Sequence, residues 1–265
     1  MLRKIAPRLI SKPAHRPRLA RIVSRRADEP IDQPASEINL GAVFRRGLLP
    51  SPAMGSIEEA RGERVVIQFD GGKCIHSRHC VLSRPDVFVP NVQGPWIHPD
   101  RATPEEIAEL AHACPSGAIS YRRLDGGPEE SPPMVNVARL RENGPLAIRA
   151  ELRIEGHGEF LRATLCRCGA SKNKPFCDSS HATAGFIATG EPAIAESRPL
   201  DGRAGVLQVV PQRDGPLRIE GNLELCTGTG HTINRVTKTA LCRCGQSSNK
   251  PYCDGTHAKV GFKSA

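Results

Sequence analysis

Ten cysteines are the residues of this chain whose type and spacing point most directly to chemistry. They lie at positions 74, 80, 114, 166, 168, 177, 226, 242, 244 and 253. Nine of them form three clusters, and Cys226 stands apart as a plain thiol. We expect no secretory signal, because the N-terminus has no continuous apolar segment, and clustered thiols then favour metal binding over disulfide bonds.

Two of the clusters belong to an internal repeat. Cys166, Cys168, Cys177 and His181 recur 76 residues later as Cys242, Cys244, Cys253 and His257. Each copy has the pattern Cys-x-Cys-x8-Cys-x3-His, so it offers three thiolates and one imidazole, which is the number of donors that one metal centre needs. Two centres could use this set: a structural zinc ion, or a [2Fe–2S] cluster in which four ligands serve two irons.

The third cluster consists of Cys74, Cys80 and Cys114. Three thiolates suit a [3Fe–4S] cluster, whereas a [4Fe–4S] cluster needs a fourth donor. The candidates for that donor are Ser77, His76, His79 and solvent. The alternative interpretation is three unrelated buried cysteines, since cysteine is often buried without any ligand role.

Short elements must position these residues. We predict a strand over 64–69, a helix over 104–114 with Thr103 as its N-cap, and a closing strand over 118–122. Within the repeats, the pattern predicts strands over 146–154, 206–210 and 217–225.

Composition favours small modules over one large core. The chain has 265 residues, of which only 4% are aromatic, while glycine and proline number 25 and 23. The formal net charge is +9, but residues 1–50 contain eleven Lys or Arg against four Asp or Glu. The remainder is therefore nearly neutral, which gives no support to a nucleic-acid-binding face. No segment approaches the ~18 consecutive apolar residues of a membrane helix.

The basic N-terminal segment (1–60) has three interpretations. Residues 1–27 contain nine Lys or Arg and no acid, as in a mitochondrial transit peptide, although three prolines interrupt the helix such a peptide would form. The alternatives are a disordered basic tail and a translation start at Met54. We expect a bacterial cytoplasmic protein, or a protein of the mitochondrial matrix if residues 1–27 are a transit peptide.

The repeat resembles the CDGSH iron–sulfur family of the mitoNEET type. The shared pattern is Cys-x-Cys-x2-Ser-x3-Pro-x-Cys-Asp-x-[Ser/Thr]-His, present in both copies. The resemblance implies one [2Fe–2S] cluster per copy, with the Cys-x-Cys pair on one iron and the third Cys with the His on the other. One departure is Ser179, which stands where the family has glycine and where the second copy keeps Gly255.

The third cluster resembles a divergent, single-cluster bacterial-type ferredoxin, with Cys114-Pro115 as its distant element. The expected fold is therefore α+β, with a small ferredoxin-like module (61–125) followed by two β-rich units (135–190 and 205–265). By resemblance, these units would pack in a pseudo-two-fold arrangement, which gives a monomer with an internal pseudo-dimer.

These residues indicate an electron-transfer protein with two [2Fe–2S] clusters and one [4Fe–4S] or [3Fe–4S] cluster. Its partner would be a redox protein. The alternative is cluster storage, transfer or sensing, with an apo-cluster acceptor as partner, and structural zinc is the third option. No nucleophile–base pair, phosphate-binding loop or flavin motif is evident, so we expect no enzyme activity on an organic substrate.

Overall fold

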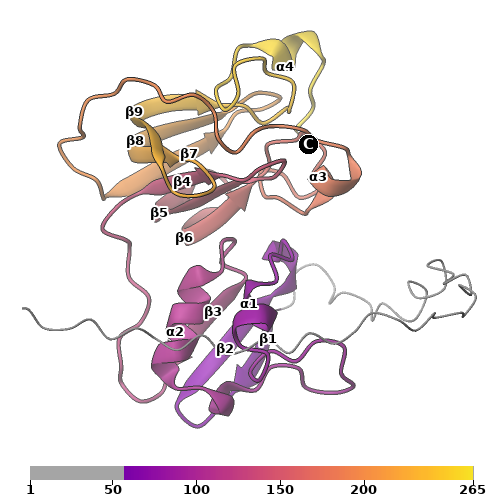
Figure 1. Ribbon diagram of the computed structural model, residues 1–265, viewed down its shortest axis with the longest axis vertical. Coiled ribbons are helices and arrows are strands. Elements are labelled where there is room, and N and C mark those ends of the chain that lie inside the picture. The colour runs from indigo at the N-terminus through magenta and orange to yellow at the C-terminus, as the bar shows by residue number, and fades with distance from the viewer. Residues whose placement is uncertain (1–56, 265) are drawn as a thin grey trace, which may run out of the picture. The chain divides into compact units, whose positions relative to one another are not determined.

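The computed structural model describes residues 57–264 of the chain (Figure 1). The expectations on a transit peptide over 1–27 and a start at Met54 therefore lie outside the described residues. The expected boundary of the N-terminal module lies at residue 61, whereas strand β1 (Ile57–Arg61) of its sheet already begins at Ile57. This strand lies at a sheet edge with alternately exposed side chains, and its sequence IEEAR has too few apolar residues to predict a strand.

A three-stranded antiparallel sheet in the order β1-β2-β3 forms the N-terminal module. The central strand β2 (Val65–Asp70) and the edge strand β3 (Ile119–Arg123) each begin and end one residue later than predicted. Short 3-10 turns lie at Gly71–Lys73 and Pro99–Arg101. The buried core of this module consists of Val65, Ile67, Val87, Phe88, Ile97, Ile107, Leu110, Ala111, Ala118, Ile119 and Tyr121, together with Cys114.

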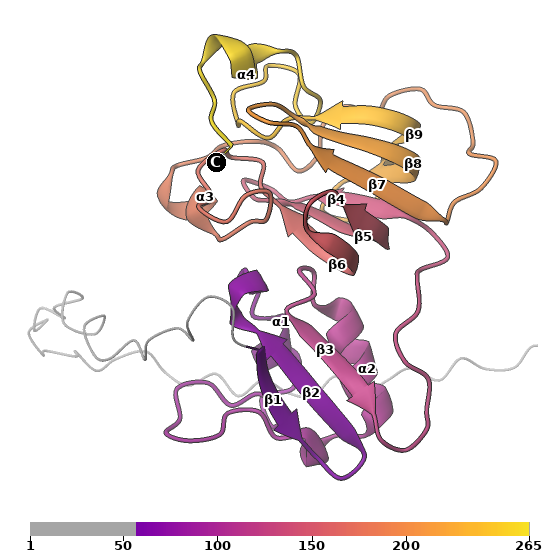
Figure 2. The ribbon, with the colours of Figure 1, turned by 180° about the vertical axis from the view of Figure 1, so that it is seen from behind.

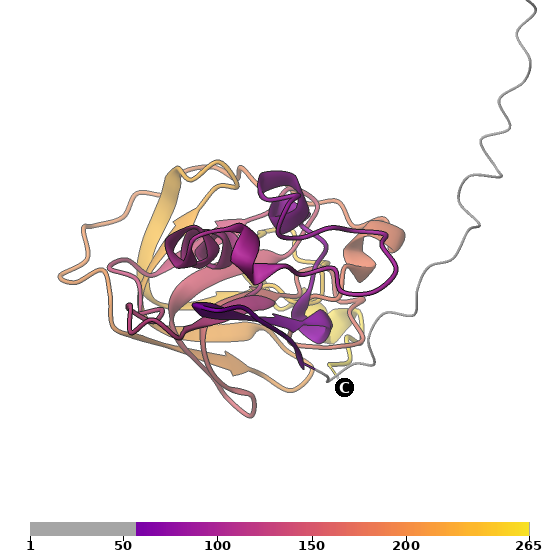
Figure 3. The same cartoon turned by 90° about the horizontal axis from the view of Figure 1, so that it is seen from below.

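Two helices cover one face of this sheet (Figure 3). Helix α2 (Pro104–Ala113) begins at the predicted residue because Thr103 and Glu106 form a reciprocal capping box. Helix α1 (His79–Ser83) is short and packs against α2. It carries Cys80, whereas Cys114 directly follows the end of α2. The two helices therefore present two of the three cysteines of this module.

Six strands and two short helices make up the β-rich region that follows. They are β4 (Val137–Leu140), β5 (Leu146–Ile154), β6 (Gly158–Leu165), α3 (Ser180–Thr183), β7 (Val206–Pro211), β8 (Leu217–Cys226), β9 (Thr232–Leu241) and α4 (Thr256–Lys259). Strands β5, β7 and β8 agree with their predicted ranges to within one residue.

Each repeat contributes three strands, and the strands of the two repeats are interleaved (Figures 1 and 2). Strand β4 pairs antiparallel with β5 of its own repeat and parallel with β8 of the other. Strand β7 does the same, antiparallel with β8 and parallel with β5. Strand β6 pairs antiparallel with β5, and strand β9 pairs antiparallel with β8. The first strand of each repeat therefore lies between the second strands of both.

The two repeats share one apolar core. Its buried members include Leu140, Leu146, Ile148, Leu152, Ile154, Leu165, Leu207, Val209, Leu217, Ile219, Leu223, Leu225, Ile233 and Leu241. The whole of the described fold is mostly β with few helices, in a small N-terminal sheet and a larger β-rich region. Within residues 57–264, no helix is long and apolar enough to cross a membrane.

Candidate metal centres

The Cys-x-Cys pair of each repeat lies where the third strand of that repeat ends. Cys166 directly follows β6, and Cys242 directly follows β9. The two sulfur atoms are 3.7 Å apart in both pairs, Cys166 with Cys168 and Cys242 with Cys244. Two thiolates on one tetrahedral metal, each with a bond of about 2.3 Å, lie about 3.8 Å apart. Both pairs therefore have the spacing that a single bound metal ion requires.

The third cysteine and the histidine form a second pair, and here the repeats differ. In the first repeat, Cys177 Sγ lies 3.4 Å from His181 Nδ1, close to the separation of about 3.5 Å expected for these two ligands on one tetrahedral metal. In the second repeat, His257 Nδ1 lies 2.9 Å from the backbone oxygen of Asp214. A hydrogen bond from Nδ1 to that carbonyl leaves Nε2 as the nitrogen available to a metal.

Backbone hydrogen bonds bring the two pairs of each site together. In the first repeat, Cys166 N–H donates to Pro175 O at 2.8 Å and Cys177 N–H donates to Thr164 O at 2.9 Å. The equivalent bonds of Cys242 and Cys253 in the second repeat are also 2.8 and 2.9 Å. The ligand loop thus folds back onto the end of the strand, which brings the third cysteine near the Cys-x-Cys pair.

The remaining motif residues shape this loop. Ser171 Oγ donates to Phe176 O at 2.7 Å, and the Asp178 carboxylate accepts from the N–H groups of Lys172 at 2.8 Å and Ser180 at 3.0 Å. The second repeat makes the same contacts. The serine and the aspartate of the motif therefore act as loop-forming groups, and the four cysteine and histidine positions are left as the donors.

The two ligand loops meet across the repeat boundary at Cys168 and Cys244, which form an isolated antiparallel bridge. Gly169 and Gly245 allow this approach. A Cβ on Gly169 would lie 2.7 Å from Cys244 O, and a Cβ on Gly245 would lie 2.6 Å from Cys168 O. Both glycines also have a φ of +81°, a conformation that residues with a Cβ rarely adopt. This contact therefore requires glycine at both positions.

A buried arginine lies between the cysteines of each pair, and motif analysis alone did not identify it as functional. Arg167 donates to Gly144 O at 2.8 Å, and Arg243 makes the equivalent bond in the second repeat. Burial lowers the pKa of both guanidinium groups, and the charge of the other repeat's cysteine, Cys242 or Cys166, opposes that shift. Each arginine thus supplies positive charge to the site of the other repeat.

The thiols of the first repeat differ in the direction of their pKa shifts. A hydrogen bond from Cys168 lowers the pKa of Cys166, and the same bond raises the pKa of Cys168. Burial raises the pKa of Cys177 to about 11. Metal binding must therefore displace protons from Cys168 and Cys177, because the thiolate is the form that ligates.

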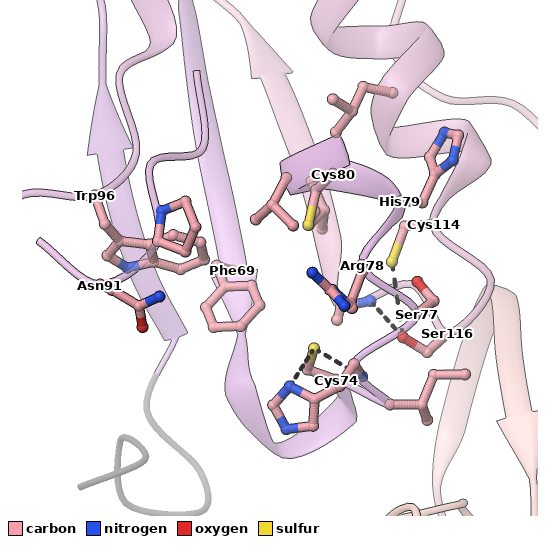
Figure 4. Close-up of a pocket in the computed structure, with 17 residues that line it drawn as sticks. Phe69, Cys74, Ser77, Arg78, His79, Cys80, Asn91, Trp96, Cys114 and Ser116 are labelled. Carbon is pink, nitrogen blue, oxygen red and sulfur yellow. Dashed lines mark hydrogen bonds between the residues drawn. The ribbon is translucent and has the colours of Figure 1, made fainter. Parts of the chain in front are cut away.

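The third site is a cavity of about 350 Å³ in the N-terminal module. Cys74, Cys80 and Cys114 line it, and their sulfur atoms face a common space in Figure 4. They come from three different segments: the loop after β2, helix α1 and the end of α2. Burial raises the pKa of Cys74 and of Cys80. The structure thus brings together the three cysteines that the sequence grouped.

The expected fourth donors have different surroundings. His76 lies beside Cys74. Its backbone N–H lies 3.4 Å from the Cys74 sulfur, and its ring Nδ1 lies 4.0 Å from the same sulfur. Ser77 lines the cavity. The ring of His79 contacts Ser83 Oγ at 3.4 Å, and Figure 4 draws this ring away from the three sulfur atoms. Among these side chains, His76 and Ser77 are therefore the ones placed to supplement the thiolates.

The loop that carries these candidates is strained. His76 and Arg78 have φ values of 53° and 61°, in the left-handed region that costs a residue with a Cβ roughly 1–2 kcal/mol. Strain of this kind is often found at ligand sites, where the surrounding structure holds it. It turns the chain so that Cys74 and Cys80 line the same cavity.

Arg162 on β6 connects the N-terminal module with the first repeat, a role that was not predicted from the sequence. Its guanidinium donates to Cys114 O at 3.1 Å and to Ile119 O at 3.2 Å, and it pairs with Glu130 at 2.6 Å. The side chain is 4% exposed. An arginine on a strand gives no local signal for such a contact, since all three partners are distant in the sequence.

Cys226 lies outside all three sites. It is buried at the end of β8, where its sulfur lies 3.8 Å from Thr232 Oγ1. Burial raises its pKa, as for an ordinary thiol in a core.

Among residues 57–264, no three His, Cys, Asp or Glu side chains converge closely enough to enclose one metal ion.

Acid is expected to weaken both histidine-containing sites. Burial lowers the pKa of His181, so the folded protein binds its proton less readily than the unfolded chain does. Stability is therefore lost as the pH falls below the ordinary histidine value of about 6.5 toward the lower folded pKa, and ligation requires the unprotonated ring in any case. Loss of visible absorbance below about pH 6.5 measures this effect.

His181→Cys and His257→Cys should each slow this acid-induced loss at their own site, because a thiolate there removes the imidazole that acid protonates. His231→Gln is the matched control, since His231 is exposed in a turn outside the sites. Equal decay of the wild type and both cysteine variants below neutral pH would show that histidine protonation is not the cause.

The sequence matches two known families. Residues 143–182 and 214–258 match the family described as "Iron-binding zinc finger CDGSH type", and residues 60–124 match the one described as "Divergent 4Fe-4S mono-cluster". The chain is also similar to the "Uncharacterized protein YjdI" of Escherichia coli strain K12 and of strain O157:H7. Each is 36% identical over 62 residues, which cover 23% of this chain and 79% of the relative. No solved structure matches the chain.

Proposed function

This chain belongs to the iron-binding CDGSH family, with a divergent 4Fe-4S mono-cluster domain before its two CDGSH domains, and on that premise we propose that it is an electron-transfer protein. Each CDGSH domain would hold one [2Fe–2S] cluster, on Cys166, Cys168, Cys177 and His181 or on Cys242, Cys244, Cys253 and His257. The N-terminal domain would hold one [4Fe–4S] or [3Fe–4S] cluster on Cys74, Cys80 and Cys114. Such clusters supply reversible one-electron reduction.

The arrangement of donors in two pairs carries this proposal. In the first repeat, Cys166 and Cys168 are separated by 3.7 Å, and Cys177 and His181 by 3.4 Å, so each pair suits one metal. Two metals served by four protein ligands is the composition of a [2Fe–2S] cluster, whereas one zinc ion takes all four donors itself. The pairs therefore favour the cluster over structural zinc.

The proposal includes a monomer in which the two CDGSH domains form a pseudo-two-fold pair. The exchange of parallel pairings between β4 and β8 and between β7 and β5 supports it. So does the reciprocal approach of Gly169 and Gly245 to the opposite ligand loop. A dimeric mass of the intact protein in solution would contradict this arrangement.

The partner in this proposal is a one-electron redox protein. The residues around the three sites serve ligand binding and packing, and we assign the chain no reaction on an organic substrate. We place the protein in a reducing compartment such as the bacterial cytoplasm, because cysteines that ligate a metal must stay reduced.

A second candidate function, cluster transfer or sensing, is favoured by one feature of the second repeat. His257 Nδ1 is engaged by Asp214 O, whereas His181 Nδ1 faces its cysteine. Cys253, the cysteine that pairs with His257 in the second repeat, is only partly buried. A site with this looser pairing is suited to releasing its cluster to an apo-protein acceptor.

Iron, acid-labile sulfide and zinc analysis of anaerobically purified protein tests the central proposal. We expect about eight irons and eight sulfides per chain, or about seven irons with a [3Fe–4S] cluster. Electron paramagnetic resonance of the dithionite-reduced protein should then resolve more than one type of centre. Zinc without sulfide would overturn the proposal.

Repeated cycles of reduction and reoxidation distinguish the two functions. For electron transfer, we expect the visible spectrum to return fully after each cycle. For cluster transfer, an apo-ferredoxin added to the oxidised protein should instead gain a cluster within minutes while this chain loses absorbance.

A further inference from the structure

The loop that carries Cys74 touches the ligand loop of the first CDGSH domain. Ser179 Oγ donates to Ile75 O at 3.1 Å, and Ile75 is the residue next to Cys74. The Ser179 N–H, in turn, donates to Cys177 Sγ at 3.4 Å. Covalent bonds and two hydrogen bonds thus form one continuous path between a ligand of one site and a ligand of another.

Two further contacts join the segment around Cys74 to the first CDGSH domain, one to its ligand loop and one to strand β6. Asn173 Nδ2 donates to Gly72 O at 3.3 Å. Lys73 Nζ lies over the ring of Phe160, 5.5 Å from its centroid. A cation at this distance from an aromatic ring is attracted to it. The contact at Ser179 therefore belongs to a small interface rather than to an isolated hydrogen bond.

Ser179 has a backbone conformation that is unfavourable for a residue with a side chain. Its φ is 69°, and the equivalent Gly255 of the second domain has a φ of 84°. Only glycine adopts this conformation freely, and another residue there costs roughly 1–2 kcal/mol. A Cβ on Gly255 would meet open space. The serine therefore occurs in the first CDGSH domain, where Ile75 O accepts a hydrogen bond from its hydroxyl.

We propose that Ser179 is a positioning residue that couples the ferredoxin-type site to the first CDGSH site. This inference rests on the proposed electron-transfer function. One electron leaves one reduced centre and one oxidised centre receives it, with no bond made or broken and no proton moved. A one-electron donor outside the chain supplies the electron. The first CDGSH domain is then the exchange partner of the N-terminal domain, and the second CDGSH domain exchanges with the first.

Three variants of the cluster-loaded full chain test this role. Ser179→Ala removes the hydroxyl and keeps the backbone cost. Ser179→Gly removes both. Gly255→Ser adds the cost in the second domain, where no such carbonyl is in reach. The readouts are hydrogen exchange of amides 71–76 and the rate of electron exchange after flash reduction by a photoexcited deazaflavin.

After flash reduction of the wild type, we expect a kinetic phase in which one cluster type is reoxidised while the other is reduced at the same rate. The rate of this phase should not depend on protein concentration, because the electron moves within one chain. Ser179→Ala and Ser179→Gly should both slow this phase and speed amide exchange by about fivefold, the ratio that corresponds to one hydrogen bond of ~1 kcal/mol. Gly255→Ser should match the wild type in both readouts.

Other outcomes overturn the proposal. If Ser179→Ala leaves the phase unchanged and Ser179→Gly alters it, backbone strain and not the hydroxyl controls coupling. If amide exchange changes while the rate does not, the contact is structural only. A wild type that reduces reversibly yet responds to neither Ser179 variant contradicts this inference alone. A wild type without this kinetic phase contradicts the electron-transfer proposal as well.

Discussion

Replacing Gly169 with alanine is expected to destabilise the paired CDGSH domains strongly and to reduce cluster content at both sites. The new Cβ would lie 2.7 Å from Cys244 O, which is backbone and cannot move aside as a side chain can. The φ of +81° adds roughly 1–2 kcal/mol, and overpacking adds about 1–3 kcal/mol. Denaturant unfolding followed by cluster absorbance measures the total.

Gly156→Ala is the matched control for this variant. Gly156 has a φ of +77°, yet a Cβ there would meet nothing within 4 Å. It should therefore show only the conformational cost of roughly 1–2 kcal/mol and retain its clusters. Equal losses in the two variants would mean that the close approach of the two ligand loops contributes nothing to stability.

Replacing Glu130 with alanine is expected to cost about 3–5 kcal/mol, because it leaves the buried Arg162 guanidinium without its carboxylate. The partners lie 2.6 Å apart, with side chains 4% and 13% exposed. Fluorescence of Trp96, the one tryptophan of the chain, reports unfolding of the N-terminal domain. Cluster absorbance reports the CDGSH domains in the same experiment.

Two further variants identify the cause. Glu105→Ala breaks the Glu105–Arg123 pair, in which Glu105 is 63% exposed and Arg123 keeps Asp125, so its cost should be much smaller than that of Glu130→Ala. The double variant Glu130→Ala/Arg162→Met removes the unpaired charge and should recover part of the stability. A double variant as unstable as Glu130→Ala would show that lost packing, and not an uncompensated charge, is responsible.

Local spacing predicted the parts of the structure that depend on neighbouring residues. The Cys-x-Cys pairs have metal-ligand spacing because two residues at that separation can place their sulfur atoms on one side of a loop. Helix α2 begins as predicted because Thr103 and Glu106 carry its capping signal within one turn. Both features require no knowledge of distant parts of the chain.

Contacts between distant residues could not be predicted in this way. Strand β4 has only four residues, and its position depends on pairing with β5 and β8 rather than on its own pattern. The partners of Arg162 and Ser179 lie in another domain. His257 matches His181 in sequence, but Asp214 O gives it different surroundings. The periodic pattern of apolar residues along the sequence contains no information about these contacts.

The interleaving of the two CDGSH domains has a consequence for how the protein is made. Strand β4 leaves the ribosome well before β8, the strand beside which it must lie, and Cys168 well before Cys244. Pairings between such distant segments form late, because the loop between them must first be closed. The first CDGSH site therefore reaches its final surroundings only after β8 and Cys244 of the second CDGSH domain have been synthesised. Iron and sulfide would then be delivered to a chain that already contains both domains.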